Sequence, residues 1–151
     1  MTTHEAAKEV VIAAPIEGLY GVIVDYERYP EFVPGMRSCR VRTVGGEKHV
    51  DYELDLGLKT VRYTLRMTER APTHVSWSLV KGDMMRVSNG SWDLAAEGGR
   101  TRARYSVEVQ IAKPPLVPQV VVDRISDEMS RLSLPRNLEA FRKRAEALAS
   151  G

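Results

Sequence analysis

The sequence predicts an α+β fold in which a curved sheet of seven antiparallel strands wraps around a long C-terminal helix. Two short helices should follow the first strand. Three observations lead to this prediction. Apolar residues recur at helical spacing after residue 15 and again from residue 117 onward. Between residues 36 and 112 they alternate with polar residues, as in strands that have one buried face. Turn signals divide this middle region into six strands in hairpin order.

Length and composition limit the class of protein. A chain of 151 residues can hold one sizeable core, so we expect residues 1–151 to form a single domain. Hydrophobic residues make up 43% and charged residues 28%, which indicates a globular chain. The net charge is only +2 and the arginines are scattered along the sequence, so no DNA partner is expected. The N-terminus lacks the pattern of a signal peptide and Cys39 is the only cysteine, so we expect a cytoplasmic location.

The first elements follow from the N-terminal 34 residues. Residues 8–14, KEVVIAA, predict a strand, and Pro15 suits the first position of a helix because its missing N–H needs no partner there. A buried stripe then runs along that helix. It consists of Ile16, Leu19, Tyr20, Ile23 and Val24. The residue before Pro30 is disfavoured in the α region, so the helix should end near residues 26–29 and at most one turn fits between Pro30 and Pro34.

The middle region has one apolar and one polar face. Turns are expected at Gly45-Gly46, Gly57, Ala71-Pro72, Gly82-Asp83 and Gly98-Gly99. The inward phase should carry Val50, Tyr52, Leu54, Leu56, Val61, Tyr63, Leu65, Met67, Val75, Trp77, Leu79, Ala103, Tyr105, Val107, Val109 and Ile111. The opposite phase carries Arg62, Arg66, Arg102 and Arg104, so no inward arginine is expected.

The strand that begins at Met85 breaks the alternation. Met85 and Val87 share one phase, whereas Trp92 and Leu94 share the other. Asn89-Gly90 could form a type I′ hairpin turn or a β-bulge. We prefer the bulge, because a hairpin would leave only about five residues on the first arm and a curved sheet needs bulges.

The C-terminal region predicts a helix with two apolar stripes. One contains Val117, Val121, Ile125, Met129 and Leu132, and the other contains Leu134, Leu138, Phe141, Ala145 and Leu148. The stripes lie about half a turn apart. Pro135 lies at their junction, so we expect the helix to kink or break there. The preceding residues 114–122, PPLVPQVVV, could cover a pocket, but we favour a simple connection.

Three segments resemble one known group of proteins. They are VDYERYPEFVPGMRSCRV (24–41), SLVKGDMMRVSNGSWDL (78–94) and LEAFRKRAE (138–146). They are similar to the START-like superfamily, also called Bet v 1-like or polyketide cyclase/dehydrase, and most similar to its Coq10-like branch. The resemblance implies a helix-grip fold. It also implies that Tyr29, Phe32 and Val33 close one end of the grip or edge an opening, although plain core packing would explain them as well.

The resemblance further implies a cavity between sheet and helix, where the residues alone would favour a solid core. Its expected role is to bind or transport a hydrophobic molecule such as a polyprenyl quinone, a lipid or a polyketide. The alternative is an aromatase/cyclase that promotes aldol cyclisation and dehydration. Transient contact with a membrane or a ribosome is possible for such proteins. The expected ligand-binding residues are Tyr52, Leu54, Tyr63, Leu65, Trp77, Met85, Trp92, Tyr105, Val121, Ile125 and Met129.

The search for other chemistry gives negative results. His4, His49 and His74 lack the spacing of a zinc site, so neither a metal nor a cofactor is expected. Residues 88–91, SNGS, do not form a nucleophile elbow. The carboxylates of residues 51, 53 and 55 lie on the polar phase of their strand. Cys39 is expected to be a buried strand residue. The sequence therefore identifies no catalytic residue.

Overall fold

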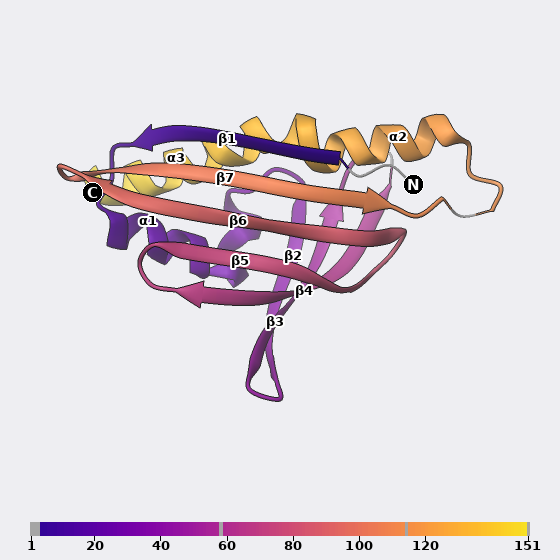
Figure 1. Ribbon diagram of the computed structural model, residues 1–151, viewed down its shortest axis with the longest axis horizontal. Helices are drawn as coiled ribbons and strands as arrows, with labels where there is room; N and C mark the ends of the chain where they lie inside the picture. The colour runs from indigo at the N-terminus through magenta and orange to yellow at the C-terminus, as the bar shows by residue number, and fades with distance from the viewer. Residues whose placement is uncertain (1–3, 58, 114, 151) are drawn as a thin grey trace.

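The computed structural model describes residues 4–57, 59–113 and 115–150. The described residues form one antiparallel sheet of seven strands in the order β1-β7-β6-β5-β4-β3-β2, whose arrangement can be followed in Figure 1. The strands are β1 His4–Ile12, β2 Met36–Val44, β3 Glu47–Asp55, β4 Thr60–Arg70, β5 His74–Gly82, β6 Met85–Glu97 and β7 Arg100–Ile111. Between β1 and β2 lie the helix α1 (Ile16–Val24) and the short 3₁₀ helix η1 (Tyr26–Glu31). This arrangement confirms the predicted fold class.

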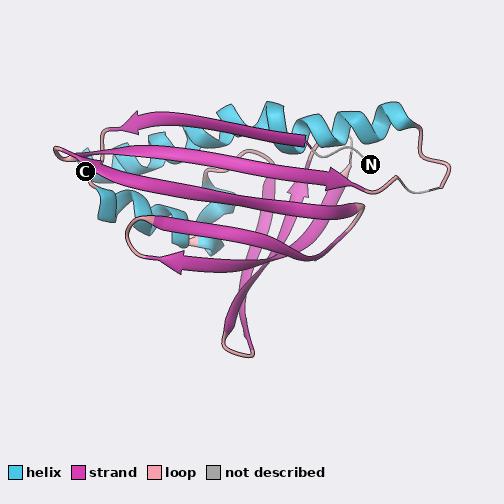
Figure 2. Cartoon of the chain, in the orientation of Figure 1, coloured by secondary structure: helices cyan, strands magenta, loops and turns pink. Residues whose placement is uncertain are grey.

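The sheet bends around the C-terminal helix. In Figure 2 the strands β1, β7, β6 and β5 run across the view, whereas β2 and β3 cross them steeply. The helical region is continuous from α2 (Gln119–Asp127) through a π-helical segment, η2 (Glu128–Leu132), into α3 (Ser133–Ser150). Within the described ranges, no helix is both long enough and apolar enough to cross a membrane.

The inward and outward phases of the sheet agree with the alternation in the sequence. Val50, Val61, Val75 and Ala103 are almost inaccessible to solvent. The bounds of the first strand differ from the prediction of residues 8–14, because β1 pairs with β7 from His4 to Ile12. Residues 13 and 14 have already left the ladder. The predicted stripe of α1 is largely buried. Val22 is buried with it, while Tyr20 and Val24 are only half-buried.

Strand β6 contains a bulge, but not at the predicted place. Met85 pairs with Ile111 and Val87 with Gln110, so Arg86 is the extra residue. The ladder then continues without a shift through Asn89-Gly90, which is neither a hairpin turn nor a bulge. The extra residue moves Val87 out of the inward phase and brings Ser88 into it, and Ser88 is buried.

The C-terminal helix departs from the α-helical period upstream of Pro135. The π segment ends at Leu132, and the chain remains helical through Pro135 without a break. A π turn contains more residues than an α turn, so it rotates the following side chains and lets α2 and α3 both face the sheet. The prediction of a break at Pro135 is therefore wrong. Leu132 and Leu148, predicted within the buried stripes, are 42% and 63% exposed.

Candidate functional site

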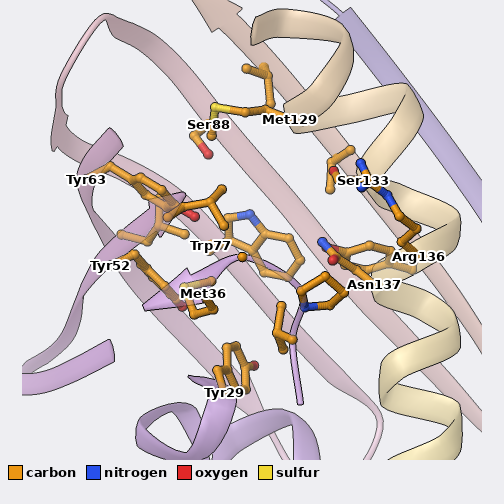
Figure 3. Close-up of a pocket in the computed structure, with 18 of the residues that line it drawn as sticks. Tyr29, Met36, Tyr52, Tyr63, Trp77, Ser88, Met129, Ser133, Arg136 and Asn137 are labelled. Atoms are coloured by element: carbon orange, nitrogen blue, oxygen red, sulfur yellow. The ribbon is translucent and has the colours of Figure 1, made fainter. Parts of the chain in front are cut away.

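A cavity of about 370 Å³ lies between the inner face of the sheet and the C-terminal helix. Figure 3 shows its side chains converging from the sheet, from the end of η1 and from η2 and α3. The lining residues are Ile23, Tyr29, Val33, Pro34, Gly35, Met36, Tyr52, Leu54, Asp55, Leu56, Gly57, Tyr63, Leu65, Met67, Val75, Trp77, Ser88, Asn89, Trp92, Tyr105, Val107, Val109, Glu128, Met129, Ser133, Arg136, Asn137 and Phe141.

Aromatic rings form the wall on the sheet side. Tyr52 stacks on Tyr63 with ring centroids 5.0 Å apart and planes inclined by 16°. The ring centroids of Trp77 and Tyr105 are 6.0 Å apart. Gly90 pairs with Trp77 across the strands, and a Cβ there would lie 2.2 Å from the indole ring. Only glycine at this position leaves room for Trp77 to lie over the strand and against the cavity.

The segment after α1 closes one end of the cavity. Tyr29 meets Phe141 edge to face, with ring centroids 5.2 Å apart, and Phe32 meets the same ring at 5.1 Å. The hydroxyl of Tyr29 donates a hydrogen bond to the carbonyl of Ile23, which satisfies the polar end of a buried ring. Tyr29 and Val33 line the cavity, whereas Phe32 does not. The aromatic residues of this segment thus combine core packing with a place in the cavity wall.

The tyrosine hydroxyls of the cavity are held in their neutral form. Burial is the main cause that raises the pKa of Tyr29 and Tyr52 well above 10. Burial likewise raises the pKa of Tyr63. It raises the pKa of Tyr105 to about 12, although hydrogen bonding with Asn137 lowers it in part. At neutral pH these groups can donate hydrogen bonds, but they cannot act as phenolate bases.

The wall on the helix side contains polar residues that were not predicted, next to the predicted Met129. Ser133, Arg136 and Asn137 follow one another at helical spacing along the cavity. The guanidinium of Arg136 pairs with the carboxylate of Glu128, and its Nε donates to the carbonyl of Leu132 over 3.2 Å. Figure 3 shows the amide of Asn137 directed toward Trp77. The four arginines expected on the outer face of the sheet are exposed, and Arg136 lines the cavity at its solvent-accessible edge from the helix.

Exposed residues mark the mouth of the cavity. Pro34, Gly35, Gly57 and Arg136 line it and are accessible to solvent. Gly35 has a φ of +78°, and a Cβ there would lie 2.5 Å from the carbonyl oxygen of Asp55. Its own carbonyl accepts a hydrogen bond of 2.8 Å from the N–H of Asp55. Glycine is required for this close contact, which fixes the loop 33–36 to the end of β3.

The predicted ligand-binding residues divide into two groups. The cavity lining includes Tyr52, Leu54, Tyr63, Leu65, Trp77, Trp92, Tyr105 and Met129. Met85, Val121 and Ile125 do not line it. They belong to or pack against a second hydrophobic cluster beneath α2, together with Val61 and Ile111. Residues 115–122 are also absent from the lining, which agrees with a connection rather than a lid, while Pro114 lies outside the described residues.

The missed lining residues had weak sequence signals. Ser133, Arg136 and Asn137 are polar and lie between positions of the two apolar stripes, so the hydrophobic pattern did not indicate that they line a cavity. The inward direction of Ser88 depends on the position of the bulge in β6, which the sequence did not locate correctly. No group of three or more potential metal ligands is found in the part of the chain that the structure describes.

A curved seven-stranded sheet closed over a long C-terminal helix, with a cavity between them, defines the helix-grip class of protein. The chain belongs to the family described as polyketide cyclase/dehydrase and lipid transport, whose model matches residues 12–142. No curated protein matches the sequence significantly.

Solved structures of low sequence identity share the fold. The Zhui aromatase/cyclase from Streptomyces sp. R1128 has a TM-score of 0.83 and 15% identity over 96% of this chain and 94% of its own. A protein from Thermus thermophilus has a TM-score of 0.81 and 18% identity over 97% and 99%. A START superfamily protein from Mycobacterium smegmatis has a TM-score of 0.78 and 18% identity over 96% and 99%. At these identities the similarity establishes the fold alone.

Proposed function

We propose that the chain binds a hydrophobic small molecule in this cavity and carries it through the cytoplasm. The observation that supports the proposal most is the cavity itself, which has about 370 Å³ of space behind an aromatic wall. A cavity of this size falls within the range of known ligand pockets, about 300–1,000 Å³. An apolar body placed there would gain about 25 cal/mol for each Å² of surface removed from water.

The arrangement of polar groups suggests how such a ligand would be oriented. Tyr63 and Tyr105 offer neutral hydroxyls from the sheet side, and Asn137 offers an amide from the helix. A ligand with one or two oxygen acceptors on an apolar framework matches this pattern. Polyprenyl quinones, lipids and polyketides all have it, and the resemblance of residues 24–41 to the Coq10-like branch makes a quinone the first ligand to test.

Intrinsic fluorescence gives a direct test of binding. Trp77 and Trp92 are the two tryptophans of the chain and both line the cavity. A short-chain ubiquinone, a fatty acid and an aromatic polyketide should be titrated while tryptophan emission is followed. We expect saturable one-to-one quenching by at least one of them. Absence of saturable binding for all three would remove the proposal.

A cavity-filling variant makes the test specific. Ser88 is buried and lines the cavity (Figure 3), so Ser88→Leu should occupy ligand space and weaken binding at least tenfold, about 1.4 kcal/mol. Val87→Leu is the matched control, because the neighbouring side chain has the opposite phase and is not in the lining. Equal loss of binding in both variants would place the ligand elsewhere.

Polyketide cyclisation is the second candidate, and the polar row on the helix favours it. An aldol closure moves a proton from a carbon next to one carbonyl to a base, joins that carbon to a second carbonyl carbon, and protonates the new alkoxide. Tyr105 and Asn137 could donate hydrogen bonds to the developing alkoxide. Glu128 is a carboxylate that could accept the proton, although its pairing with Arg136 opposes that role.

Product analysis distinguishes carriage from cyclisation. The protein should be added to a reconstituted polyketide synthase that releases an uncyclised poly-β-ketone, and the products compared by mass. Aldol closure alone leaves the mass unchanged, and the dehydration that follows releases the new hydroxyl and a hydrogen from a neighbouring carbon as water. A cyclase would therefore give a new product lighter by the mass of water, and Asn137→Ala would reduce its yield while hydrophobic probes still bind. An unchanged product profile, with binding intact, leaves carriage as the function.

Delivery of a hydrophobic ligand would require contact with a membrane or another acceptor. We propose that the connection before α2 and the first turn of α2 make such a contact with a membrane, since Leu116 in the connection is fully exposed and Val120 in α2 is 70% exposed. Replacing both by serine should reduce co-sedimentation with vesicles without changing ligand binding. Co-sedimentation with ribosomes is the corresponding test of the other acceptor suggested by the resemblance.

A further inference from the structure

A surface groove continues the cavity along α3. It is lined by Phe32, Pro34, Pro135, Arg136, Glu139, Ala140, Lys143 and Arg144. Pro34 and Arg136 also line the cavity, so the two hollows meet at the mouth. The α3 residues of the groove recur at spacings of one and three to four, so they form one face of the helix. The groove is thus an outward extension of the cavity.

The groove combines an apolar floor with a positive rim. The guanidinium of Arg144 lies 5.1 Å from the centroid of the Phe32 ring, so a cation covers the apolar floor. Arg144 also pairs with Glu31 over 2.6 Å, which holds its side chain in place. With Arg136 and Lys143 the groove lining carries three cationic side chains and one carboxylate, Glu139.

Lys143 is the cation best placed to meet a new anion. Arg136 is paired with Glu128, and Arg144 with Glu31. Glu139 is occupied by Arg142, whose hydrogen bond lowers the pKa of that carboxyl. Among the residues that the structure describes, Lys143 has no carboxylate within salt-bridge distance. It lies two helical turns beyond Arg136, about 10 Å along the axis.

We propose that the groove binds the anionic end of the ligand whose apolar body occupies the cavity. The inference rests on the proposed binding function and narrows it to an amphipathic acid, with a carboxylate or a phosphate on a long apolar chain. The alkyl chain of the ligand passes the mouth between Pro34 and Arg136 and enters the groove. The anionic group then lies between the guanidinium of Arg136 and the ammonium of Lys143, where it neutralises the excess positive charge of the rim.

Three probes of equal chain length test the inference: dodecanoic acid, dodecyl phosphate and dodecanol, each below its micelle concentration. Their affinities should be measured by tryptophan emission in the wild-type protein. Both anions should bind more tightly than the alcohol by about fivefold or more, and the advantage should shrink at about 1 M salt, where the Debye length is about 3 Å. Tighter binding of the phosphate indicates a phosphate ester, and tighter binding of the carboxylate indicates a free acid.

Two variants test whether the anionic group lies in the groove, one that makes the groove more negative and one that makes it less negative. Lys143→Glu should weaken both anions by about fivefold and leave the alcohol within twofold, whereas Glu139→Gln should strengthen both anions. Lys113→Glu is the matched control, because this lysine is exposed, lies outside both hollows and makes the same change in net charge. Each variant should keep the wild-type melting temperature within a few degrees.

The outcomes separate this inference from the function on which it rests. Binding of all three probes with equal affinity would support the cavity as a ligand site and overturn the anionic groove. An equal effect of Lys143→Glu and Lys113→Glu would also overturn it, because only net charge would then be involved. Failure of all three dodecyl probes to bind, while a quinone or a polyketide still binds, would overturn this inference alone. The proposed function would be overturned only if the quinone and the polyketide also failed to bind.

Discussion

Two stretches of the interior use the same face of the sheet and the same C-terminal helix, yet one is packed and the other is hollow. Beneath α2, the side chains of Val61, Ile111, Val122 and Ile125 fill the space between helix and sheet. Beneath the start of α3, the helix presents Ser133 and Asn137 instead, and a cavity of about 370 Å³ remains. The alternation of a strand decides which side chains point inward, while the size of the opposing helix residues decides whether the space is filled.

The largest expected difference between the two regions is their response to high pH. The hollow region contains Tyr29, Tyr52, Tyr63 and Tyr105, whereas the packed cluster has only Tyr63 at its border. Folding raises these pKa values above 10, chiefly by burial. Their stabilisation is therefore complete below pH 10 and is lost as the pH rises toward the folded values, about 12 for Tyr105.

Tyrosine absorbance and denaturant unfolding, measured from pH 8 to 12, check this expectation. The free energy of unfolding should fall steeply above pH 10, and the buried phenols should ionise together with unfolding. The Tyr105→Phe variant lacks the phenol whose pKa in the folded protein is about 12, so its absorbance titration should lose the contribution of that group. Complete phenol ionisation near pH 10 in a protein that stays folded would mean that water already solvates the cavity hydroxyls.

Truncation in the packed region should have the next largest effect. Ile125 is 1% exposed within the cluster beneath α2. Ile125→Ala should reduce the free energy of unfolding by about 2–5 kcal/mol, because a void forms where packing is complete. Val120→Ala is the control on the same helix, and at 70% exposure it should change stability by less than about 0.5 kcal/mol.

Truncation in the hollow region should cost less stability despite a larger side chain. Trp77→Ala should reduce the free energy of unfolding by about 1–2 kcal/mol, below the 3–5 kcal/mol typical of a fully packed aromatic ring. Ligand affinity should fall at the same time, because the indole lines the cavity. A loss of stability larger than that of Ile125→Ala would contradict the contrast between the two regions.

The smallest effect is expected for a single hydroxyl of the aromatic wall. Tyr63→Phe removes almost no volume, and the ring can still stack on Tyr52. Affinity for a quinone or another oxygen-bearing ligand should fall by about 0.5–1.5 kcal/mol, while stability is nearly unchanged. Affinity for a saturated hydrocarbon chain should not change, which provides the control within the same variant.

Much of the fold could be predicted because short-range patterns control it. The alternation of Tyr52, Tyr63 and Tyr105 fixes their common inward phase, and the turn glycines fix the hairpins. The helix side of the site could not be predicted in the same way. A π segment at residues 128–132 leaves no sequence pattern that distinguishes it from a proline break, so the sequence did not indicate that Ser133 and Asn137 line the cavity. Whether Ile125 fills a core or lines a cavity depends on how much space the surrounding side chains leave between helix and sheet, which the sequence pattern does not give.

Native mass spectrometry of the protein purified from its own host tests most directly whether the hollow region is a ligand site. The wild-type protein should carry one hydrophobic small molecule, released by organic solvent, and Ser88→Leu should carry none or much less. The added mass would also identify the ligand and show whether it bears a carboxylate or a phosphate. Wild-type protein that is purified without any added mass, and that takes up neither a quinone, a fatty acid nor a polyketide in the same instrument, would contradict a binding function for the cavity.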